Sequence, residues 1–405
     1  MILGRSALRC LWFAAMMRLS CAQAGVWGID PLIGVVGDYS TNAQLLAAPH
    51  TAGTDGALLL NAPTTYNGNA FEFFVIPSFR VSNNPGYSSV TSDYDHLTLK
   101  SEFDGERSVL TASAAVARDS SLYYDYLIDG GSGVRRDSWN GDLNWDRSFT
   151  ERIDLDTDVS FTHARYAEGA GVPTLTDFKY TSLSPTFSWI SSERGKLTLS
   201  GSVGSYDSLD GTTSSRNANL QIGFVRQLSE IWSLTSSVGY SRAIDRLESY
   251  EEFLEFTPTG PEIVVVPVKL ESTQNGTVYS LLLNRKGERL NLNATASRQL
   301  SPTGFDYLAL LTVYELNTTY ACSERLSFGS DIRYVKSQIP QQKAPTDEIT
   351  PKYIGITLNW RWTERWTATF GASYVTERYS PPGATVSSRE VSISLSRQFD
   401  HIKFQ

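Results

Sequence analysis

The feature that most constrains this chain is a strict alternation of apolar and small polar residues along many successive segments. In residues 366–374, Trp, Ala, Phe, Ala and Tyr occupy every second position, with Thr, Thr, Gly and Ser between them. The same pattern recurs in residues 290–297, 326–334, 354–362 and 391–396. A period of two places alternate side chains on opposite faces of a strand. We therefore expect an all-β protein whose strands have one apolar and one polar face.

The length of these runs separates two kinds of β protein. Strands of soluble sheets average about 5–6 residues, whereas a tilted strand needs about 9–11 residues to cross a bilayer. Most runs here reach the longer value, and aromatic residues stand near their ends: Trp139, Trp145, Trp189, Trp232, Trp360, Trp362, Trp366 and Tyr374. A bilayer leaves unpaired backbone groups without water, so its strands must close on themselves. The pattern predicts a transmembrane antiparallel up-and-down β-barrel.

The turns predict the topology. A short turn containing Glu, usually followed by Arg, recurs at Glu106, Glu151, Glu193, Glu230, Glu288, Glu324 and Glu364. Longer polar segments alternate with these turns, at residues 119–137, 167–177, 208–215, 244–269 and 336–352. Outer-membrane barrels have short periplasmic turns and long extracellular loops. Counting the connections predicts roughly 16–18 strands, with 18 favoured, because such barrels close with even numbers.

The amino terminus has the features of an export signal, since basic Arg5 and Arg9 precede an apolar stretch at residues 10–17 and an Ala22-Gln23-Ala24 cleavage site. We predict that residues 1–24 are a signal peptide and that the protein reaches the bacterial outer membrane. Cleavage would leave Cys322 as the lone cysteine, which excludes an internal disulfide.

The remaining chain divides into three parts. Residues 71–399 are expected to form the barrel, and residues 400–405 a tail after Phe399. Residues 25–70 either supply the first pair of strands or form a periplasmic arm or plug. Two short alternating stretches, at 32–39 and 56–61, favour the strand pair.

Composition excludes several functions. The net charge is −8, so the chain lacks the basic balance of a nucleic-acid binder. The four His residues, His50, His96, His163 and His401, show no metal-ligand spacing. We therefore expect no catalytic residue, metal or cofactor and no enzyme activity. An outer-membrane enzyme and a structural barrel with a filled lumen are the minority alternatives.

Charged residues on the polar faces are the candidate lumen-lining residues. The strands around the Glu151 turn carry Asp142, Asp146, Asp154, Asp156 and Asp158, and alternation places them on one acidic wall. Elsewhere we expect Arg226, Arg242, Arg298, Asp331, Arg333 and Arg361 to point inward. Such a lumen can bind hydroxyl-rich or charged solutes. The alternative is that these charges only pair with one another in a water-filled lumen.

One long loop has a composition of its own. Residues 244–269 contain Glu248, Glu251, Glu252 and Glu255 before the apolar run 263–268. The four glutamates fall at helical spacing, which predicts a short acidic helix. The segment would either fold into the lumen as a constriction or stand above the membrane as an exposed excursion.

Several short motifs together resemble a family of outer-membrane β-barrel porins found with exopolysaccharide-biosynthesis loci. The resemblance is carried by the repeated Ser/Thr-Glu-Arg turns and by three segments: Tyr39-Ser40-Thr41-Asn42, Ile76-Pro77-Ser78 and Ser297–Gly304. It implies a conduit for secreted polysaccharide, with outer-membrane lipid, polysaccharide or oligosaccharide, and periplasmic export machinery as partners. The alternative is a general or sugar-selective diffusion porin, for which the barrel alone suffices.

Overall fold

A computed structural model describes residues 25–42, 45, 52–83, 94–120, 135–167, 175–257, 260–303, 308–338, 348–380 and 385–404. The predicted signal peptide lies outside these residues. Every regular element of the described chain is a strand, so no helix there could span a membrane. The strands are β1 (Val26–Ile29), β2 (Leu32–Ser40), β3 (Gly53–Asn61), β4 (Thr64–Asn67), β5 (Phe71–Asn83), β6 (Tyr94–Asp104), β7 (Ser108–Ser120), β8 (Arg135–Thr150), β9 (Ile153–Tyr166), β10 (Phe178–Ser192), β11 (Gly195–Ser208), β12 (Thr213–Gln227), β13 (Trp232–Thr257), β14 (Gly260–Lys286), β15 (Leu290–Pro302), β16 (Leu308–Ala321), β17 (Leu326–Gln338), β18 (Glu348–Arg361), β19 (Trp366–Ser380), β20 (Thr385–Gln398) and β21 (Ile402–Phe404).

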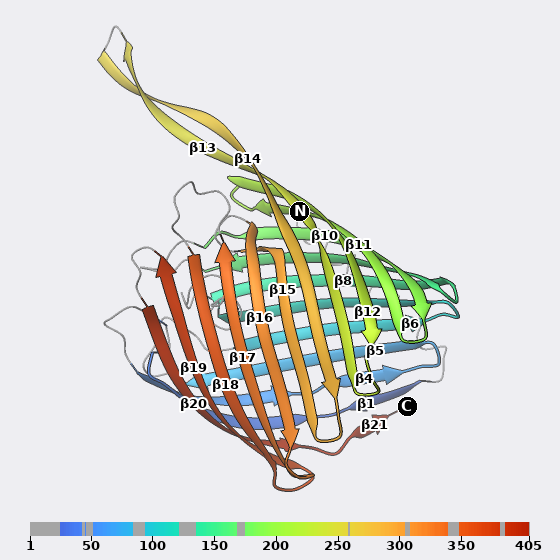
Figure 1. Cartoon of the computed structure of the whole chain (residues 1–405). Helices are drawn as coiled ribbons and strands as arrows, with labels where there is room; N and C mark the ends of the chain where they lie inside the picture. The colour runs from blue at the N-terminus through green and yellow to red at the C-terminus, as the bar shows by residue number, and fades with distance from the viewer. Residues whose placement is uncertain are drawn as a thin grey trace.

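The wall is a closed antiparallel barrel of 18 strands, made by β2, β3 and β5–β20 (Figure 1). Each strand pairs with its neighbours in the sequence, and β2 closes the barrel against β20, with Leu32 opposite Gln398 and Ser40 opposite Glu390. The predicted fold class and the higher predicted strand number are therefore confirmed. An 18-strand barrel is wide enough for an aqueous channel.

The closing seam has a small extension built from β1, β4 and β21. These short strands continue β2, β3 and β20 after breaks at Pro31, Pro63 and Phe399–His401, and β1 pairs with both β4 and β21. Proline cannot donate a ladder hydrogen bond, so the two proline breaks interrupt their strands at one level. His401 Nδ1 lies 2.8 Å from Asp30 Oδ1, which joins the first and last parts of the described chain.

The outer face of the barrel wall carries a belt of exposed apolar residues. Leu220 and Ile222 on β12 are 61% and 67% exposed, and other strands place large apolar residues at the same level. An apolar band of this extent around a closed barrel is the surface that transmembrane barrels turn towards lipid. Trp and Tyr residues border the belt at both ends, as the sequence predicts: Trp139, Tyr240, Tyr314 and Tyr374 towards the loops, and Trp189, Trp360, Trp362 and Tyr320 towards the short turns.

The longest hairpin replaces the predicted acidic helix. β13 and β14 stay paired from Trp232 opposite Arg285 to Thr257 opposite Gly260. Figure 1 shows this hairpin projecting far beyond the rest of the barrel. The helix prediction is therefore wrong, and so is the idea that this segment constricts the lumen. The segment is the exposed excursion that was the other alternative.

Candidate functional site: the inner face of the barrel

A contact across the interior identifies the inner face. The Tyr206 hydroxyl on β11 donates a hydrogen bond to the carbonyl oxygen of Thr303, at 3.2 Å. Thr303 directly follows β15, which is not a neighbour of β11, so the contact must cross the inside of the barrel. Residues directly opposite each other on neighbouring strands lie on the same face of the sheet. Tyr206 is opposite Tyr180, Tyr180 is opposite Thr162, and Thr162 is opposite Asn140, so all four lie on the inner face.

The same alternation places the five predicted aspartates of β8 and β9 on the inner face. Asp146 lies opposite Asp156, and Asn144 lies opposite Asp158. Asn144 donates from its side-chain nitrogen to both carboxylate oxygens of Asp156, at 3.2 and 3.3 Å. Further hydrogen bonds come from hydroxyls, Ser113 to Asp142 and Ser148 to Asp154. We call Asp142, Asp146, Asp154, Asp156 and Asp158 the acidic wall.

The acidic wall has no basic partner in the described structure. None of its carboxylates forms an ion pair there. Other carboxylates of the inner face, by contrast, are paired with arginines. Arg80 bridges Asp38 and Asp55 at 2.8 and 3.0 Å, and Arg333 contacts Glu315 at 3.3 Å. Like charges opposite each other on neighbouring strands repel. The wall therefore creates a negative field that a mobile cation would relieve.

The arrangement favours a diffuse field over chelation. Among the described residues, no three His, Cys, Asp or Glu side chains are placed to hold one metal ion. The wall instead presents carboxylates, amides and hydroxyls along two strands, a surface that attracts cations and hydrogen-bonds with hydroxyl-rich molecules.

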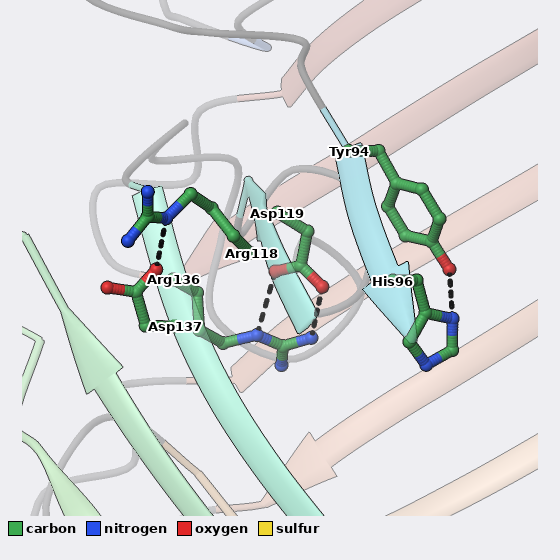
Figure 2. A network of polar contacts seen from close by, with 6 residues as sticks. All are labelled: Tyr94, His96, Arg118, Asp119, Arg136 and Asp137. Atoms are coloured by element: carbon green, nitrogen blue, oxygen red, sulfur yellow. Dashed lines mark hydrogen bonds and ion pairs between the residues drawn. The ribbon is translucent and has the colours of Figure 1, made fainter. Parts of the chain in front are cut away.

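Two ion pairs join β7 and β8, one on each face of the barrel wall, and they differ in how far their side chains are exposed (Figure 2). On the inner face, Arg136 holds Asp119 through two nitrogens, at 3.1 and 3.2 Å, and the Asp119 side chain is 1% exposed. On the outer face, Arg118 contacts Asp137 at 2.8 Å and is 58% exposed. Nearby on β6, His96 Nδ1 and the Tyr94 hydroxyl lie 2.7 Å apart.

The remaining sequence-predicted residues divide between the two faces. Asp331 and Arg333 on β17 and Arg361 on β18 share the inner face, and Arg361 is exposed at the short-turn end. Arg226 and Arg242 are in phase with Leu220, Ile222 and Tyr240, so they lie on the outer face and the prediction that they point inward is wrong. Their long side chains can reach water from the borders of the apolar belt.

Arg298 also departs from the prediction. It lies opposite Tyr279, in phase with the outer face of β14, and is half-buried where β15 separates from β14. Its Nη2 donates to Gln338 Oε1 at 3.2 Å.

Beyond Arg298, the end of the β15–β16 hairpin enters the barrel. The ladder between β14 and β15 ends at Tyr279 opposite Arg298, although β15 and β16 remain paired up to Pro302 opposite Leu308. Leu308 is fully buried in a cluster with Phe178 and Tyr206, and Leu300 packs against that cluster. We call residues 299–303 and 308–312 the inner tip. It packs on the inner face of β10 and β11 through this cluster and reaches β14 at Gly276 through Leu310.

A second inward contact lies beside the closing seam. Leu45, from the segment between β2 and β3, is buried against Val375 and Val386 of β19 and β20, with Tyr353 beside them. Sequence reasoning missed both inward elements, together with the Arg80–Asp38–Asp55 cluster. The alternation of apolar and polar residues could have revealed this cluster. Arg80 stands between Phe79 and Val81, and Asp38 directly precedes Tyr39, so both charged residues alternate with residues of the outer face.

The closed wall, the apolar outer belt and the charged inner face together define an outer-membrane β-barrel of the porin-like class. No family model matches the chain, and no curated protein matches it. Among solved structures, it is similar to the ferric citrate transporter FecA in its unliganded form, at 9% identity and a TM-score of 0.50, over 92% of this chain and 78% of that one.

Two further solved structures are also similar. OccAB3 of Acinetobacter baumannii gives 11% identity and a TM-score of 0.44, over 94% of this chain and 99% of that one. OccK2 of Pseudomonas aeruginosa, solved in complex with glucuronate, gives 10% identity and a TM-score of 0.45, over 92% and 98%. At these identities the likeness concerns the fold alone. None of these comparisons links the chain to exopolysaccharide.

Proposed function

We propose that the protein is an outer-membrane diffusion channel that favours cations and neutral hydroxyl-rich solutes over anions. The observation that carries this proposal is the acidic wall: five inner carboxylates without a basic partner among the described residues, in a barrel of 18 strands. Charged groups lining a lumen concentrate ions of opposite sign and repel like ones. The hydroxyl and amide groups between the aspartates supply hydrogen bonds for a sugar.

The test is single-channel recording of the purified, detergent-folded protein in a planar bilayer, with maltotriose added to one side. Discrete open steps that maltotriose interrupts would support the proposal. A folded, heat-modifiable barrel that gives no open steps would overturn it, because a diffusion channel must conduct without a partner.

Export of polysaccharide is the second candidate, and it rests on the sequence resemblance described above. A deletion strain separates the two. Loss of surface polysaccharide with unchanged uptake of small sugars would favour export and a partnership with periplasmic machinery. Slower uptake with normal surface polysaccharide would favour the diffusion channel.

A further inference from the structure

The inner tip covers a wall built of polar side chains. Tyr206, Ser215, Asp245 and Ser272 stand opposite one another in a single row across β11, β12, β13 and β14. All four lie on the inner face, because Tyr206 does. Ser215 and Asp245 are each 1% exposed, so this part of the wall is closed to solvent.

Polar atoms in this row have no hydrogen-bonding partner. They include Ser215 Oγ, Asp245 Oδ1 and Ser272 Oγ, and neighbouring Ser241 Oγ and Thr213 Oγ1 are in the same situation. The other carboxylate oxygen of Asp245 accepts a hydrogen bond from Gln274. A buried polar atom without a partner costs about 1–3 kcal/mol. So many in one patch require an explanation.

The inner tip provides that explanation, because it presents apolar side chains to this polar surface. The Cδ2 atom of Leu310 lies 3.6 Å from the position that a Cβ atom would occupy at Gly276 of β14. Leu308 packs on Tyr206 of β11. Since β12 and β13 lie between β11 and β14, the inner tip spans them. Leucines cannot satisfy hydroxyls or carboxylates, so the tip is a poor permanent cover for this wall.

The two sides of the inner tip are attached differently. Residues 299–303 have no ladder to β14, whereas Leu310, Leu311 and Thr312 stay paired with β17. The end of the tip is seated on the opposite wall by the hydrogen bond of Tyr206 with Thr303 and by the packing of Leu308. We propose that the row Tyr206–Ser215–Asp245–Ser272 is a binding surface for neutral, hydroxyl-rich solutes that is exposed when the inner tip moves away. The proposal rests on the proposed channel function and names the solute class for a second part of the same lumen.

The chemistry of the row suits a sugar. Hydroxyls donate and accept, the Asp245 carboxylate accepts, and the Gln274 amide can donate. Phe178 and Tyr206 stack with ring centroids 5.3 Å apart beside the row, so apolar ring faces adjoin the polar groups. Sites for small ligands combine aromatic surface with a few polar groups in this way. The row has one acidic residue, against the five of the acidic wall, which favours a neutral solute over a cation.

The first experiment locks the inner tip. Gly276→Cys and Leu310→Cys are combined in a Cys322→Ser background, which removes the exposed free thiol of the described chain. Maltotriose binding to the folded protein in detergent is measured by calorimetry, with each single-cysteine variant as a control. Binding should be at least tenfold weaker in the oxidised pair than in the reduced pair. Equal binding in the two states, or none in either, would overturn the proposal.

The second experiment uses the unpartnered hydroxyls. Ser215→Ala and Ser272→Ala each remove a buried hydroxyl without a partner, so the closed form should be at least as heat-stable as the wild type. Each change should nevertheless weaken maltotriose binding about threefold, through one lost hydrogen bond. Ser394→Ala, on the inner face of β20, is the matched control and should leave binding unchanged. Wild-type binding in both Ala variants would contradict the proposal.

Failure of this inference and failure of the channel proposal can be told apart. If the barrel conducts ions but the oxidised and reduced pairs bind maltotriose equally, only the covered binding surface is excluded. If binding depends on the redox state but the barrel never conducts, the diffusion channel is excluded and the surface remains.

Discussion

The Tyr206 hydroxyl of β11 lies 3.2 Å from the carbonyl oxygen of Thr303, which directly follows β15, although β11 and β15 stand apart in the barrel wall. This contact lies inside the barrel, beside the packing of Leu308 on Tyr206. It defines the inner face, and it fixes the inner tip against the wall that the tip covers.

Tyr206→Phe should loosen the inner tip while keeping the aromatic contacts of Tyr206. It removes one hydrogen bond, worth about 1 kcal/mol, and leaves the stacked ring on Phe178. We expect larger fluctuations of the open-channel current and faster exchange of backbone amides in residues 308–312. Tyr314→Phe is the control, because that hydroxyl contacts Tyr279 on the outer face. Equal noise and exchange in the Tyr206 variant and the wild type would show that the bond does not hold the tip.

Arg136 and Arg118 allow a matched comparison of ion pairs on one strand pair (Figure 2). Arg136→Gln leaves Asp119 buried without its cation, and breaking a buried pair costs about 3 kcal/mol. Arg118→Gln breaks an exposed pair, which salt and water already weaken. The temperature at which the barrel loses its heat-modifiable band should therefore fall in the first variant and stay unchanged in the second. Equal effects would mean that the inner pair is solvated like the outer one.

Asp210 should make the turn between β11 and β12 sensitive to acid. Burial alone would raise the pKa of Asp210, but hydrogen bonds from Ser208 and Thr212 outweigh it, so the pKa is lowered. A lowered pKa means that the ionised carboxylate stabilises the folded turn above the ordinary aspartate value of about 3.9, and that this contribution is lost as the pH falls further.

Amide exchange at Thr212 and Thr213 checks this linkage. Relative to an Asp210→Asn variant at the same pH, protection of these amides in the wild type should be higher at pH 6 and should converge on that of the variant below pH 4. A constant difference across this range would contradict the assigned role of the carboxylate.

The strands and the acidic wall could be predicted because both are local patterns. Alternation with period two fixes which residues share a face, and the short turn at Glu151 places Asp146 of β8 opposite Asp156 of β9, with the other aspartates of the acidic wall on the same face. The same alternation places Arg242 on the outer face, because it stands two residues after Tyr240. The prediction that Arg242 points inward followed from its charge and ignored this alternation.

The inner tip could not be predicted, because its cause is non-local. Leu300 is in phase with Leu292 and Ala296, so by alternation alone it would face lipid. It turns inward only because β15 leaves β14 after Arg298. The predicted acidic helix failed for a related reason, since pairing between β13 and β14 overrides helical spacing within residues 248–255.

The central claim is that the acidic wall makes the lumen selective for cations, and the most direct measurement is the reversal potential in a tenfold KCl gradient. The wild type should be cation-selective. Replacing Asp142, Asp146, Asp154, Asp156 and Asp158 by Asn should remove most of that selectivity, whereas replacing Glu106, Glu151, Glu193, Glu288 and Glu324 of the short turns by Gln should not. An anion-selective wild type, or a five-Asn variant that keeps the wild-type reversal potential, would contradict the account.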